Sequence, residues 1–375
     1  MTHDDAVALL DRVQDATRRH DVSHLMEFYA DDALAVTPML GEMRGRDAIR
    51  ASWLRLFEMF PDIALTVSEM IVEGGRIAVI GQITATDKGG GWFGLAPTGG
   101  VINYRIVLRL DVVDGKIVRD ERIYDSAGVV ERLQKAHLDK ELRTAAEVQR
   151  ALAARGSASG TFFEFAGDSL PCRTVGGDFF DFLELPSGSV GIAIGDVAGK
   201  GPAAALLAAL IQGMLAVEAE GGGCPASVLE RINQRLSARR LDPRFATLVY
   251  GVLSPDGGFV YSNAGHNPPA LITPDGIQRL TIGGPILGSF REATFEQETL
   301  RLGAGETLLM FTDGVTEASD PDNQEFGEVR LLEVARSALT SDSKTLLRQI
   351  LAELQEFCRG AEQADDITLA ISRFI

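Results

Sequence analysis

Four short acidic segments in the second half of the chain carry its strongest chemical signal. Each places an aspartate where an apolar, strand-like run meets a glycine turn, or at the start of such a run, and a sheet can present such side chains to a shared cleft. The segments are Val175-Gly-Gly-Asp178, Gly195-Asp-Val-Ala-Gly-Lys-Gly201, Phe311-Thr-Asp-Gly314 and Asp365-Asp-Ile-Thr368. The sequence therefore predicts one cleft lined by Asp178, Asp196, Asp313 and Asp365.

Carboxylate oxygens are the ligands that Mg²⁺ and Mn²⁺ prefer. A zinc site is disfavoured, because His266 is the only histidine after residue 150 and Cys172, Cys224 and Cys358 lie far apart in the sequence. The chemistry that hard divalent cations support at such a site is metal-assisted hydrolysis or phosphoryl transfer.

Length and composition indicate a globular protein of two domains. The chain has 375 residues, which is long enough for two domains with a core each. Of these residues 45% are hydrophobic and 24% charged, the composition of a globular protein rather than a disordered one. The formal net charge of -17 argues against a nucleic-acid or anionic-membrane surface, since both need clustered lysine and arginine.

The cysteines and the start of the chain indicate a cytoplasmic protein with free thiols. The three cysteines form no CxxC pair, and the first residues lack the basic and apolar regions of a signal peptide. No apolar run reaches the roughly 18 residues of a membrane span. The longest, Ala203 to Val217, follows Gly201-Pro202 and predicts a buried helix with proline in its first turn.

Residues 1–125 predict an α+β domain that begins with helices. Val7, Leu10, Val13 and Ala16 repeat at helical spacing, and a second helical pattern runs from Asp47 to Phe60. From Ile63 the sequence pattern changes to strands separated by glycine turns, which predicts a curved antiparallel sheet. The strands are expected at residues 63–68, 70–73, 76–86, 101–113 and 116–124.

Residues 126–158 predict a helical linker. Leu138, Leu142, Ala145, Gln149 and Leu152 follow a four-three-four-three spacing, which is the seam of a short coiled coil, and a buried polar residue on such a seam can fix register or partner number. The alternative is one amphipathic helix lying on the following domain of the same chain. The two interpretations have equal weight.

Residues 159–375 alternate strand-like and helical runs. Helices are expected at residues 203–219, 225–238, 329–339 and 343–359, between short strands that are often joined by hairpin turns. The simplest arrangement of these elements is two sheets covered by helices.

Five ordered motifs in this part of the chain resemble a known family. They resemble those of metal-dependent protein phosphatases (PPM, protein phosphatase 2C-like), in particular the bacterial stage II sporulation protein E (SpoIIE) branch, over about residues 145–375. Five motifs in order form a strong signal, whereas one alone would be weak. The motifs are Val175-Gly-Gly-Asp-Phe-Phe-Asp-Phe182, Ile194-Gly-Asp-Val-Ala-Gly-Lys-Gly201, Asn263-Ala-Gly-His-Asn-Pro-Pro269, Phe311-Thr-Asp-Gly-Val-Thr-Glu-Ala318 and Asp365-Asp-Ile-Thr368.

The resemblance implies an α/β/β/α sandwich with two Mn²⁺ or Mg²⁺ ions at one end. Asp196 would bridge the ions, the backbone carbonyl of Val197 would bind one of them, and Asp313 and Asp365 would complete the other, with Asp178 acting directly or through a water. Such ions activate water for in-line attack on a phosphoryl group. The implied substrate is a phosphoserine or phosphothreonine protein, by family analogy an anti-sigma factor antagonist.

Four other residues have weaker assignments. Asp181 and Asp366 are second choices that can hydrogen-bond the loops rather than touch metal. His266 is a possible general acid, but its Asn-Ala-Gly-His-Asn-Pro-Pro setting favours a strand turn held by side-chain hydrogen bonds. Arg173 matches a phosphate-binding arginine of eukaryotic-type relatives, with a surface salt bridge as the open alternative.

One position departs from those relatives. They carry a histidine two residues after the bridging aspartate that can protonate the leaving group, and this chain has Ala198 there. The proton must then come from water or another residue.

Residues 1–125 resemble the nuclear transport factor 2-like or SnoaL-like cone, a cone-shaped α+β barrel with a pocket. Trp53, Trp92, Phe93, Tyr104 and Arg105 are candidates to line it, although such aromatic residues are more often plain core. A cyclase of this kind would need a strand histidine paired with an aspartate, whereas the histidines of this part are His3, His20 and His24, all in its helical half. A domain that senses a small ligand or forms a homodimer is therefore favoured.

The function predicted from the sequence is that of a phosphoprotein phosphatase regulated by its first domain. Two alternatives remain: a catalytically silent pseudo-phosphatase that only holds its partner, and a small-molecule enzyme in the first domain fused to a phosphatase. The four aspartates count against the former, and the missing strand histidine against the latter.

Overall fold

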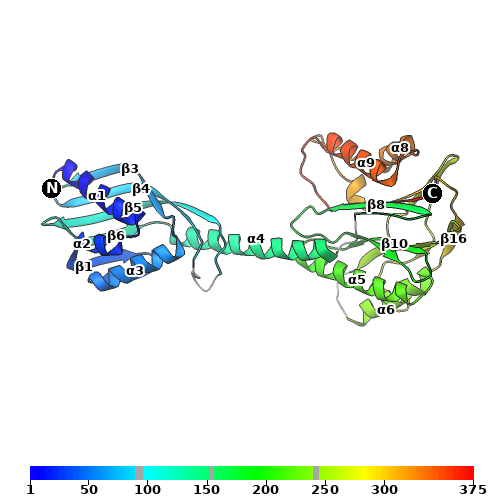
Figure 1. Cartoon of the computed structure of the whole chain (residues 1–375), viewed down its shortest axis with the longest axis horizontal. Helices are drawn as coiled ribbons and strands as arrows, with labels where there is room; N and C mark the ends of the chain where they lie inside the picture. The colour runs from blue at the N-terminus through cyan, green and yellow to red at the C-terminus, as the bar shows by residue number, and fades with distance from the viewer. Residues whose placement is uncertain (90–95, 153–155, 240–244) are drawn as a thin grey trace. The chain divides into compact units, whose positions relative to one another are not determined.

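The computed structural model describes residues 1–375 apart from 90–95, 153–155 and 240–244. The chain divides into two compact units, Met1–Glu141 and Leu142–Ile375 (Figure 1). The division falls inside helix α4, Ser126–Leu152, so one continuous helix belongs to both units.

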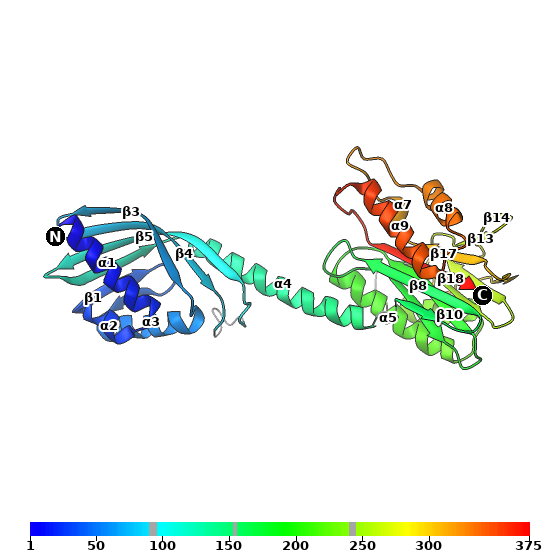
Figure 2. The ribbon, with the colours of Figure 1, turned by 45° about the horizontal axis from the view of Figure 1, so that its top comes forward.

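The first unit is one curved six-stranded sheet with helices packed on it. The strands are ordered β2-β1-β6-β5-β4-β3, and helices α1 and α3 lie across one face (Figure 2). Its main core joins residues of helices α1, α2 and α3, such as Leu9, Leu25 and Trp53, to sheet residues such as Val79 and Ile117. The elements are α1 His3–Arg18, α2 Val22–Glu27, β1 Tyr29–Thr37, β2 Gly41–Arg44, α3 Arg46–Met59, β3 Ala64–Glu73, β4 Arg76–Thr86, β5 Val101–Val113 and β6 Lys116–Ile123.

Strands β1 and β2 correct the sequence-based expectation, which placed no strand before Ile63. Strand β1 pairs with β6 in parallel, so the sheet is mixed rather than wholly antiparallel. The exposed pair Asp31 and Asp32 interrupts the alternation of buried residues along β1, and strand patterns depend on that alternation. The helical signals on both sides therefore hid the strand.

The second unit contains two sheets of six strands. One has the order β15-β12-β11-β10-β9 with β16 paired to β12, and the other has the order β14-β13-β17-β18-β8-β7. The strands are β7 Ser157–Ser159, β8 Phe163–Leu170, β9 Phe179–Glu184, β10 Val190–Val197, β11 Ala246–Leu253, β12 Gly258–Ala264, β13 Ala270–Thr273, β14 Gly276–Arg279, β15 Gly283–Gly284, β16 Glu298–Arg301, β17 Thr307–Phe311 and β18 Ile367–Phe374. The helices are α5 Pro202–Glu220, α6 Pro225–Ala238, α7 Asp313–Thr316, α8 Glu328–Ser337 and α9 Ser343–Cys358.

Helices cover the outer faces of both sheets, which gives the predicted α/β/β/α sandwich (Figure 1). Strand β10 is apolar on both faces, as expected for a strand between two layers. Its Ala193 packs in the core with α5 and α6, whereas its Ile192 and Ile194 pack in the core between the sheets. A third core joins the second sheet to α8 and α9.

Helix α5 matches the buried helix predicted between Ala203 and Val217. Pro202 occupies its first turn, and Ala208, Ile211 and Leu215 are fully buried in the core. A stretch of 18 residues within this 19-residue helix has a mean hydropathy of 1.6, so the helix is long and apolar enough to cross a membrane by length and composition. Half of that stretch is buried inside the protein. The core position explains the apolar sequence without a membrane.

Helix α4 bears on both interpretations of the linker. Its C-terminal end packs in the second unit, where Ala146 forms a small core with Val175 and Ala205, as the single-chain alternative requires. The seam residues Leu138 and Leu152 are more than half exposed. A coiled coil with a second copy therefore stays a prediction.

The start of α9 offers a test of how the helical layer is stabilised. The Asp342 carboxylate accepts hydrogen bonds from the backbone N–H and the hydroxyl of Thr345, both at 2.8 Å. Replacing Asp342 by alanine removes this cap, so we expect a loss of about 1 kcal/mol in the free energy of unfolding, or about 2–4 °C in Tm. Urea unfolding followed by circular dichroism measures it. Asp342→Asn keeps a capping oxygen and should stay within about 0.5 kcal/mol of wild type; an equal loss in both variants would contradict the cap.

Candidate metal centre

The four predicted aspartates lie at one end of the two packed sheets. Asp178 immediately precedes β9 and Asp196 lies near the end of β10, and these strands pair antiparallel with Phe179 opposite Gly195. Asp313 follows the end of β17 and Asp365 precedes β18, and these strands are also antiparallel neighbours. In an antiparallel pair the end of one strand meets the start of the next. Each sheet thus contributes two of the carboxylates to the same edge.

Hydrogen bonds across the two sheets fix this edge. The Thr312 hydroxyl, from the second sheet, donates to Asp178 Oδ2 at 2.6 Å. The same hydroxyl accepts the backbone N–H of Thr368 at 3.1 Å. The Gly177 N–H, beside the first sheet, donates to Asp366 Oδ2 at 2.7 Å. The first and third of these bonds tie one sheet to the other, whereas the second joins the ends of β17 and β18 within one sheet. All three are buried, so water does not compete for these groups.

The carboxylates repel one another. Burial raises the pKa of Asp178 well above its usual range, and the nearby Asp196 raises it further against the Thr312 hydrogen bond. Burial, with charge repulsion from Asp313 and then Asp365, raises the pKa of Asp196 to about 6. Raised pKa values of this kind mark carboxylates that lack a compensating charge.

One lysine compensates part of this charge. Lys200 Nζ lies 2.8 Å from Asp365 Oδ2 and donates to the Ala364 carbonyl at 2.6 Å. Within the part of the chain that the structure describes, Asp178, Asp196 and Asp313 form no salt bridge. Oxygen donors with unbalanced negative charge are the set that Mg²⁺ and Mn²⁺ require, so the residues present fit the two cations that the motifs implied.

Two glycines allow the loops to approach this closely. A Cβ at Gly177 would lie 2.8 Å from the Val197 carbonyl oxygen, the oxygen assigned to a metal on sequence grounds. A Cβ at Gly314 would collide with the Asp366 carbonyl. Both positions therefore need glycine for close backbone packing rather than for an unusual φ.

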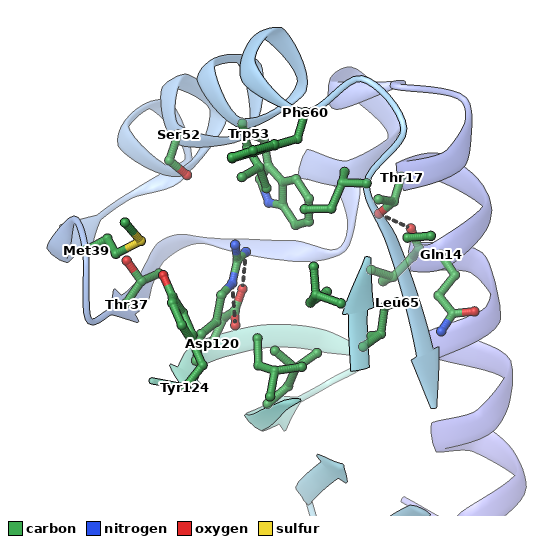
Figure 3. A pocket seen from close by; sticks show the side chains of 18 of the residues that line it. Gln14, Thr17, Thr37, Met39, Ser52, Trp53, Phe60, Leu65, Asp120 and Tyr124 are labelled. Atoms are coloured by element: carbon green, nitrogen blue, oxygen red, sulfur yellow. Dashed lines mark hydrogen bonds and ion pairs between the residues drawn. The ribbon is translucent and has the colours of Figure 1, made fainter. Parts of the chain in front are cut away.

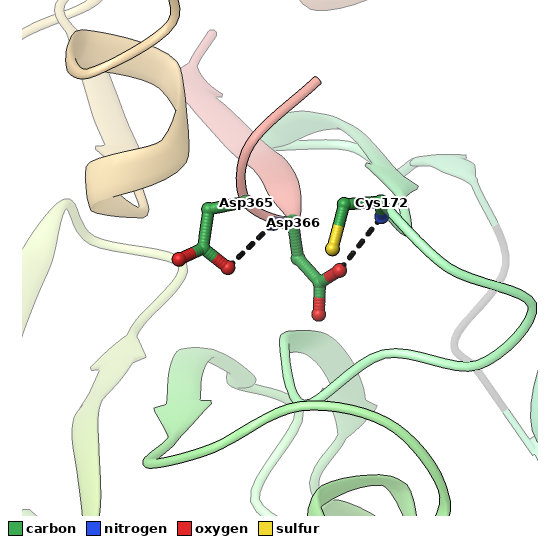
Figure 4. Close-up of side chains that lie close together, drawn as sticks. All are labelled: Cys172, Asp365 and Asp366. Carbon is green, nitrogen blue, oxygen red and sulfur yellow. Dashed lines mark hydrogen bonds between the residues drawn. The ribbon is translucent and has the colours of Figure 1, made fainter. Parts of the chain in front are cut away.

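Asp366 forms hydrogen bonds to the loops, which is the alternative to metal binding that the sequence suggested for it. Its carboxylate accepts the backbone N–H of Cys172 at 2.8 Å (Figure 4) and that of Gly177 at 2.7 Å. The thiol of Cys172 and the carboxylates of Asp365 and Asp366 offer ligand atoms within 4.8 Å of one another, but burial raises the pKa of the Cys172 thiol. A protonated thiol is a poor ligand for a hard cation, so these contacts position the loop beside the carboxylates.

The remaining predicted residues lie near this edge in different environments. His266 is buried in a turn, where its backbone N–H donates to Asn263 Oδ1 at 2.7 Å. This is the role in a turn that the sequence favoured for it. Burial lowers the pKa of His266 to about 4, so the ring is neutral at pH 7.

Arg173 is exposed and, within the described ranges, forms no salt bridge. Its phosphate-binding role stays a prediction. Asp181 lies on β9, where burial raises its pKa to about 6.

Sequence reasoning missed Thr312 and Lys200, although both stand inside the quoted motifs. Their roles depend on partners 134 and 164 residues away in the chain, and no local pattern reports such a contact. The sequence identified Gln149 only as a polar residue on the seam of the predicted linker helix. In the structure, Gln149 Nε2 donates to the Gly176 carbonyl at 2.8 Å and its Oε1 accepts the Gly176 N–H at 3.3 Å. Helix α4 thus holds the backbone two residues before Asp178.

A cavity of about 270 Å³ opens in the first unit, between α1, α3 and the sheet (Figure 3). Of the residues predicted to line a pocket here, Trp53 and Tyr104 do so. Arg105 is exposed on the sheet, which corrects its assignment, because its side chain alternates to the opposite face from Tyr104. Trp92 and Phe93 lie outside the described residues.

The comparisons with known proteins agree with both units. Residues 186–375, just over half of the chain, match the family model of stage II sporulation protein E (SpoIIE). Residues 10–120 match the model of the SnoaL-like domain.

Curated relatives match the second half of the chain. Protein IcfG of Synechocystis sp. is 34% identical over 228 residues, which cover 53% of this chain and 36% of that protein. Phosphoserine phosphatase RsbU of Bacillus subtilis is 27% identical over 242 residues, which cover 63% of this chain and 70% of RsbU. The matched region is thus about a third of the length of the first relative and somewhat over two thirds of the second.

Solved structures share the fold of the second unit. The RsbU and RsbW domains of a Mycobacterium tuberculosis protein superpose with a TM-score of 0.51 at 26% identity, covering 59% of this chain and 62% of that one. The PP2C domain of SiaA from Pseudomonas aeruginosa superposes with a TM-score of 0.56 at 21% identity, covering 64% and 99%. With its motifs at the end of a two-sheet sandwich, the chain belongs to the stage II sporulation protein E family and joins a PP2C-like phosphatase fold to a SnoaL-like domain.

Proposed function

We propose that this protein is a metal-dependent phosphatase that hydrolyses a phosphoserine or phosphothreonine on a signalling protein. The observation that carries the proposal is the convergence of Asp178, Asp196, Asp313 and Asp365 from two sheets onto one edge. Among the described residues, only the Lys200 salt bridge to Asp365 offsets their negative charge. The name of the Bacillus subtilis relative, phosphoserine phosphatase RsbU, supports the substrate class.

The four aspartates and the Val197 carbonyl would hold two divalent cations, Mn²⁺ or Mg²⁺. When bound, such cations lower the pKa of water and neutralise charge on a phosphoryl group. The protein's own residues supply the geometry: Thr312 orients Asp178, and Lys200 holds Asp365. Arg173, exposed on the loop that follows β8, would bind phosphate oxygens.

The second part of the proposal concerns regulation. The partner is an anti-sigma factor antagonist in the cytoplasm, and the SnoaL-like unit controls the phosphatase unit through α4. Gln149 supports this route, because it bonds both polar backbone groups of Gly176. The exposed Leu138 and Leu152 supply the apolar surface for a homodimer through α4.

The catalytic proposal predicts an absolute need for Mn²⁺ or Mg²⁺ and for Asp196. Purified protein should hydrolyse p-nitrophenyl phosphate and a phosphoserine peptide with Mn²⁺ and lose activity in EDTA. Asp196→Asn should lower kcat at least about a hundredfold, because removing even an indirect partner of a metal ligand costs about 10- to 100-fold.

A matched control separates the site from general damage. Asp256, an exposed aspartate that accepts the Gly258 N–H in a hairpin turn, tests the same substitution away from the cleft. Asp256→Asn should keep wild-type activity. Turnover without metal would contradict the metal-dependent mechanism. No turnover together with tight binding of the phosphopeptide would exclude the phosphatase and favour a scaffold.

Burial of Asp196, together with repulsion from Asp313 and Asp365, predicts that Asp196→Asn stabilises the metal-free protein. The pKa of Asp196 rises from 3.8 to about 6 on folding, so the folded state favours the protonated form. Its contribution to stability is complete below pH 3.8 and is lost as the pH rises through 6. In EDTA at pH 7.5 the variant should therefore exceed wild type by on the order of 1 kcal/mol, about 2–4 °C in Tm.

Differential scanning calorimetry between pH 4 and 8 measures this effect. Added Mn²⁺ should reverse the order, because wild type binds the cations and the variant does not. An Asp196→Asn protein that is less stable than wild type in EDTA would contradict the repulsion.

The contact between Gln149 and Gly176 predicts an effect on metal affinity. Gln149→Met keeps the length of the side chain and removes both hydrogen bonds. The loop before Asp178 then loses its anchor, so we expect the Mn²⁺ concentration for half-maximal activity to rise about tenfold. Glu147→Gln, at an exposed position on the same helix, should leave it unchanged. Equal Mn²⁺ requirements in the two variants would remove α4 from the regulatory route.

A further inference from the structure

His266 lies where the chain crosses from one sheet of the second unit to the other. It follows β12, which is in the sheet of β10, and precedes β13, which is in the sheet of β17. Asn263 holds its backbone on both sides: the His266 N–H donates to Asn263 Oδ1 at 2.7 Å, and Asn263 Nδ2 donates to the His266 carbonyl at 3.0 Å. His266 is only 6% exposed, so this turn fixes the place of a buried imidazole ring.

One nitrogen of the ring contacts the strand beside Asp196. His266 Nδ1 lies 2.8 Å from the Thr247 hydroxyl, and Thr247 is the residue of β11 directly opposite Asp196 of β10. Residues directly opposite each other in an antiparallel pair point to the same face. Asp196 comes two residues after Ile194, which packs in the core between the sheets, so Asp196 and Thr247 both point toward the other sheet.

The other nitrogen faces the strand that leads to Asp313. A hydrogen bond between the ring and the Phe311 backbone opposes the lowering of the His266 pKa by burial, as donation from the ring to a carbonyl does. Phe311 is the last residue of β17 and stands two residues before Asp313. Because Thr247 engages Nδ1, the hydrogen is on Nε2 and Nδ1 accepts the Thr247 hydroxyl. Nε2 makes no hydrogen bond of standard geometry, so its bond to Phe311 is long or bent.

A neutral imidazole suits this position because it offers one donor and one acceptor without a charge. Burial lowers the pKa of His266 to about 4, so the ring keeps the neutral form at pH 7. A lysine or arginine in its place would bring a positive charge near the carboxylates and compete with cations, and an acidic residue would add to the repulsion at Asp196. With both nitrogens engaged, the ring is not available as a general acid.

The other bonds between the two sheets serve different groups of this edge. The Thr312 hydroxyl orients Asp178, and Asp366 holds the loop before Asp178. Neither bond involves β10 or β11, so His266 supplies a separate connection between the sheets at the strand pair that carries Asp196.

We infer that His266 is a positioning residue that fixes the separation of Asp196 and Asp313, by connecting Thr247 of one sheet to the Phe311 backbone of the other. Groups that orient metal ligands affect metal affinity without touching the metal. The separation of these two carboxylates therefore decides how well the site holds its cations. The inference deepens the proposed function and rests on it, because the cations belong to that proposal.

Two variants of Thr247 test the inference on the full chain and leave His266 itself in place. Thr247→Val keeps the shape of the side chain and removes the hydroxyl, whereas Thr247→Ser keeps the hydroxyl. Isothermal titration calorimetry with Mn²⁺ should give a Kd about tenfold higher in Thr247→Val, the effect of losing a group that orients a metal ligand. The Kd of Thr247→Ser should stay within about twofold of wild type.

His266→Phe removes both contacts of the ring and should weaken Mn²⁺ binding at least as much as Thr247→Val. Adding Thr247→Val to His266→Phe should then raise the Kd little further, because the two side chains act through one shared contact. Full additivity of the two effects would show that Thr247 acts without His266 and would overturn the inference.

Ser262→Ala separates positioning from a general loss of stability. Ser262 is fully buried on β12, and its hydroxyl donates to the Glu296 carbonyl at 2.7 Å, so the variant loses one buried hydrogen bond away from the carboxylates. It should lower Tm about as much as Thr247→Val, by about 2–4 °C, and leave the Kd for Mn²⁺ unchanged. An equal rise of the Kd in both variants, or a wild-type Kd in Thr247→Val, would overturn the inference.

A second measurement examines the ring without metal or activity. The chain has five histidines, and in ¹⁵N-labelled protein the ring signals absent from His266→Phe belong to His266. At pH 7 the ring should carry its hydrogen on Nε2, and Thr247→Val should move the Nδ1 signal; a hydrogen on Nδ1 would overturn the inference. A wild type that binds no Mn²⁺ would contradict the proposed function and this inference with it, whereas a Thr247→Val protein that binds Mn²⁺ like wild type would contradict this inference alone.

Discussion

Burial of like-charged carboxylates close together is the constraint on which the second unit depends. Asp178 stands immediately before β9 and Asp196 near the end of the neighbouring β10, and charge from Asp313 and Asp365 of the other sheet reaches Asp196. A protein gains nothing in stability from collecting like charges at low dielectric. Such an arrangement persists because the surrounding cores over-determine it, and strained sites of this kind are where function is found.

The surrounding polar groups hold the carboxylates without neutralising them. Thr312 and Asp366 connect the two sheets through neutral donors, a hydroxyl and backbone N–H groups, whereas Lys200 forms its salt bridge with the more exposed Asp365. If Lys200 or an arginine had paired with Asp196 instead, the metal-free protein would be more stable and a cation would have to displace it. The distribution of charge thus leaves Asp178, Asp196 and Asp313 open to cations while their positions stay fixed.

The sequence could predict that the four aspartates share one edge because each stands at or beside a strand end, where an apolar run meets a glycine turn or begins. The antiparallel pairing of β9 with β10 and of β17 with β18 then brings those ends together. It could not predict the contacts of Thr312, Asp366 and Gln149, because side-chain hydrogen bonds between distant segments depend on how the sheets and α4 pack. Strand β1 was missed for a local reason: Asp31 and Asp32 break its alternation.

Helix α4 sets the condition that any regulation must meet. Its Val129 is buried in the core of the first unit with Phe60 and Ile102, and its Gln149 bonds the loop of the second. A signal at the first position changes the metal site only if two arrangements of α4 differ in their contacts at both ends, because a ligand shifts an equilibrium by no more than its differential affinity for the two states. The bidentate contact to Gly176 is the right size for such a difference: two hydrogen bonds, each worth about 1 kcal/mol, correspond to roughly a 30-fold change in population. A switch through α4 therefore does not require the carboxylates themselves to be rebuilt.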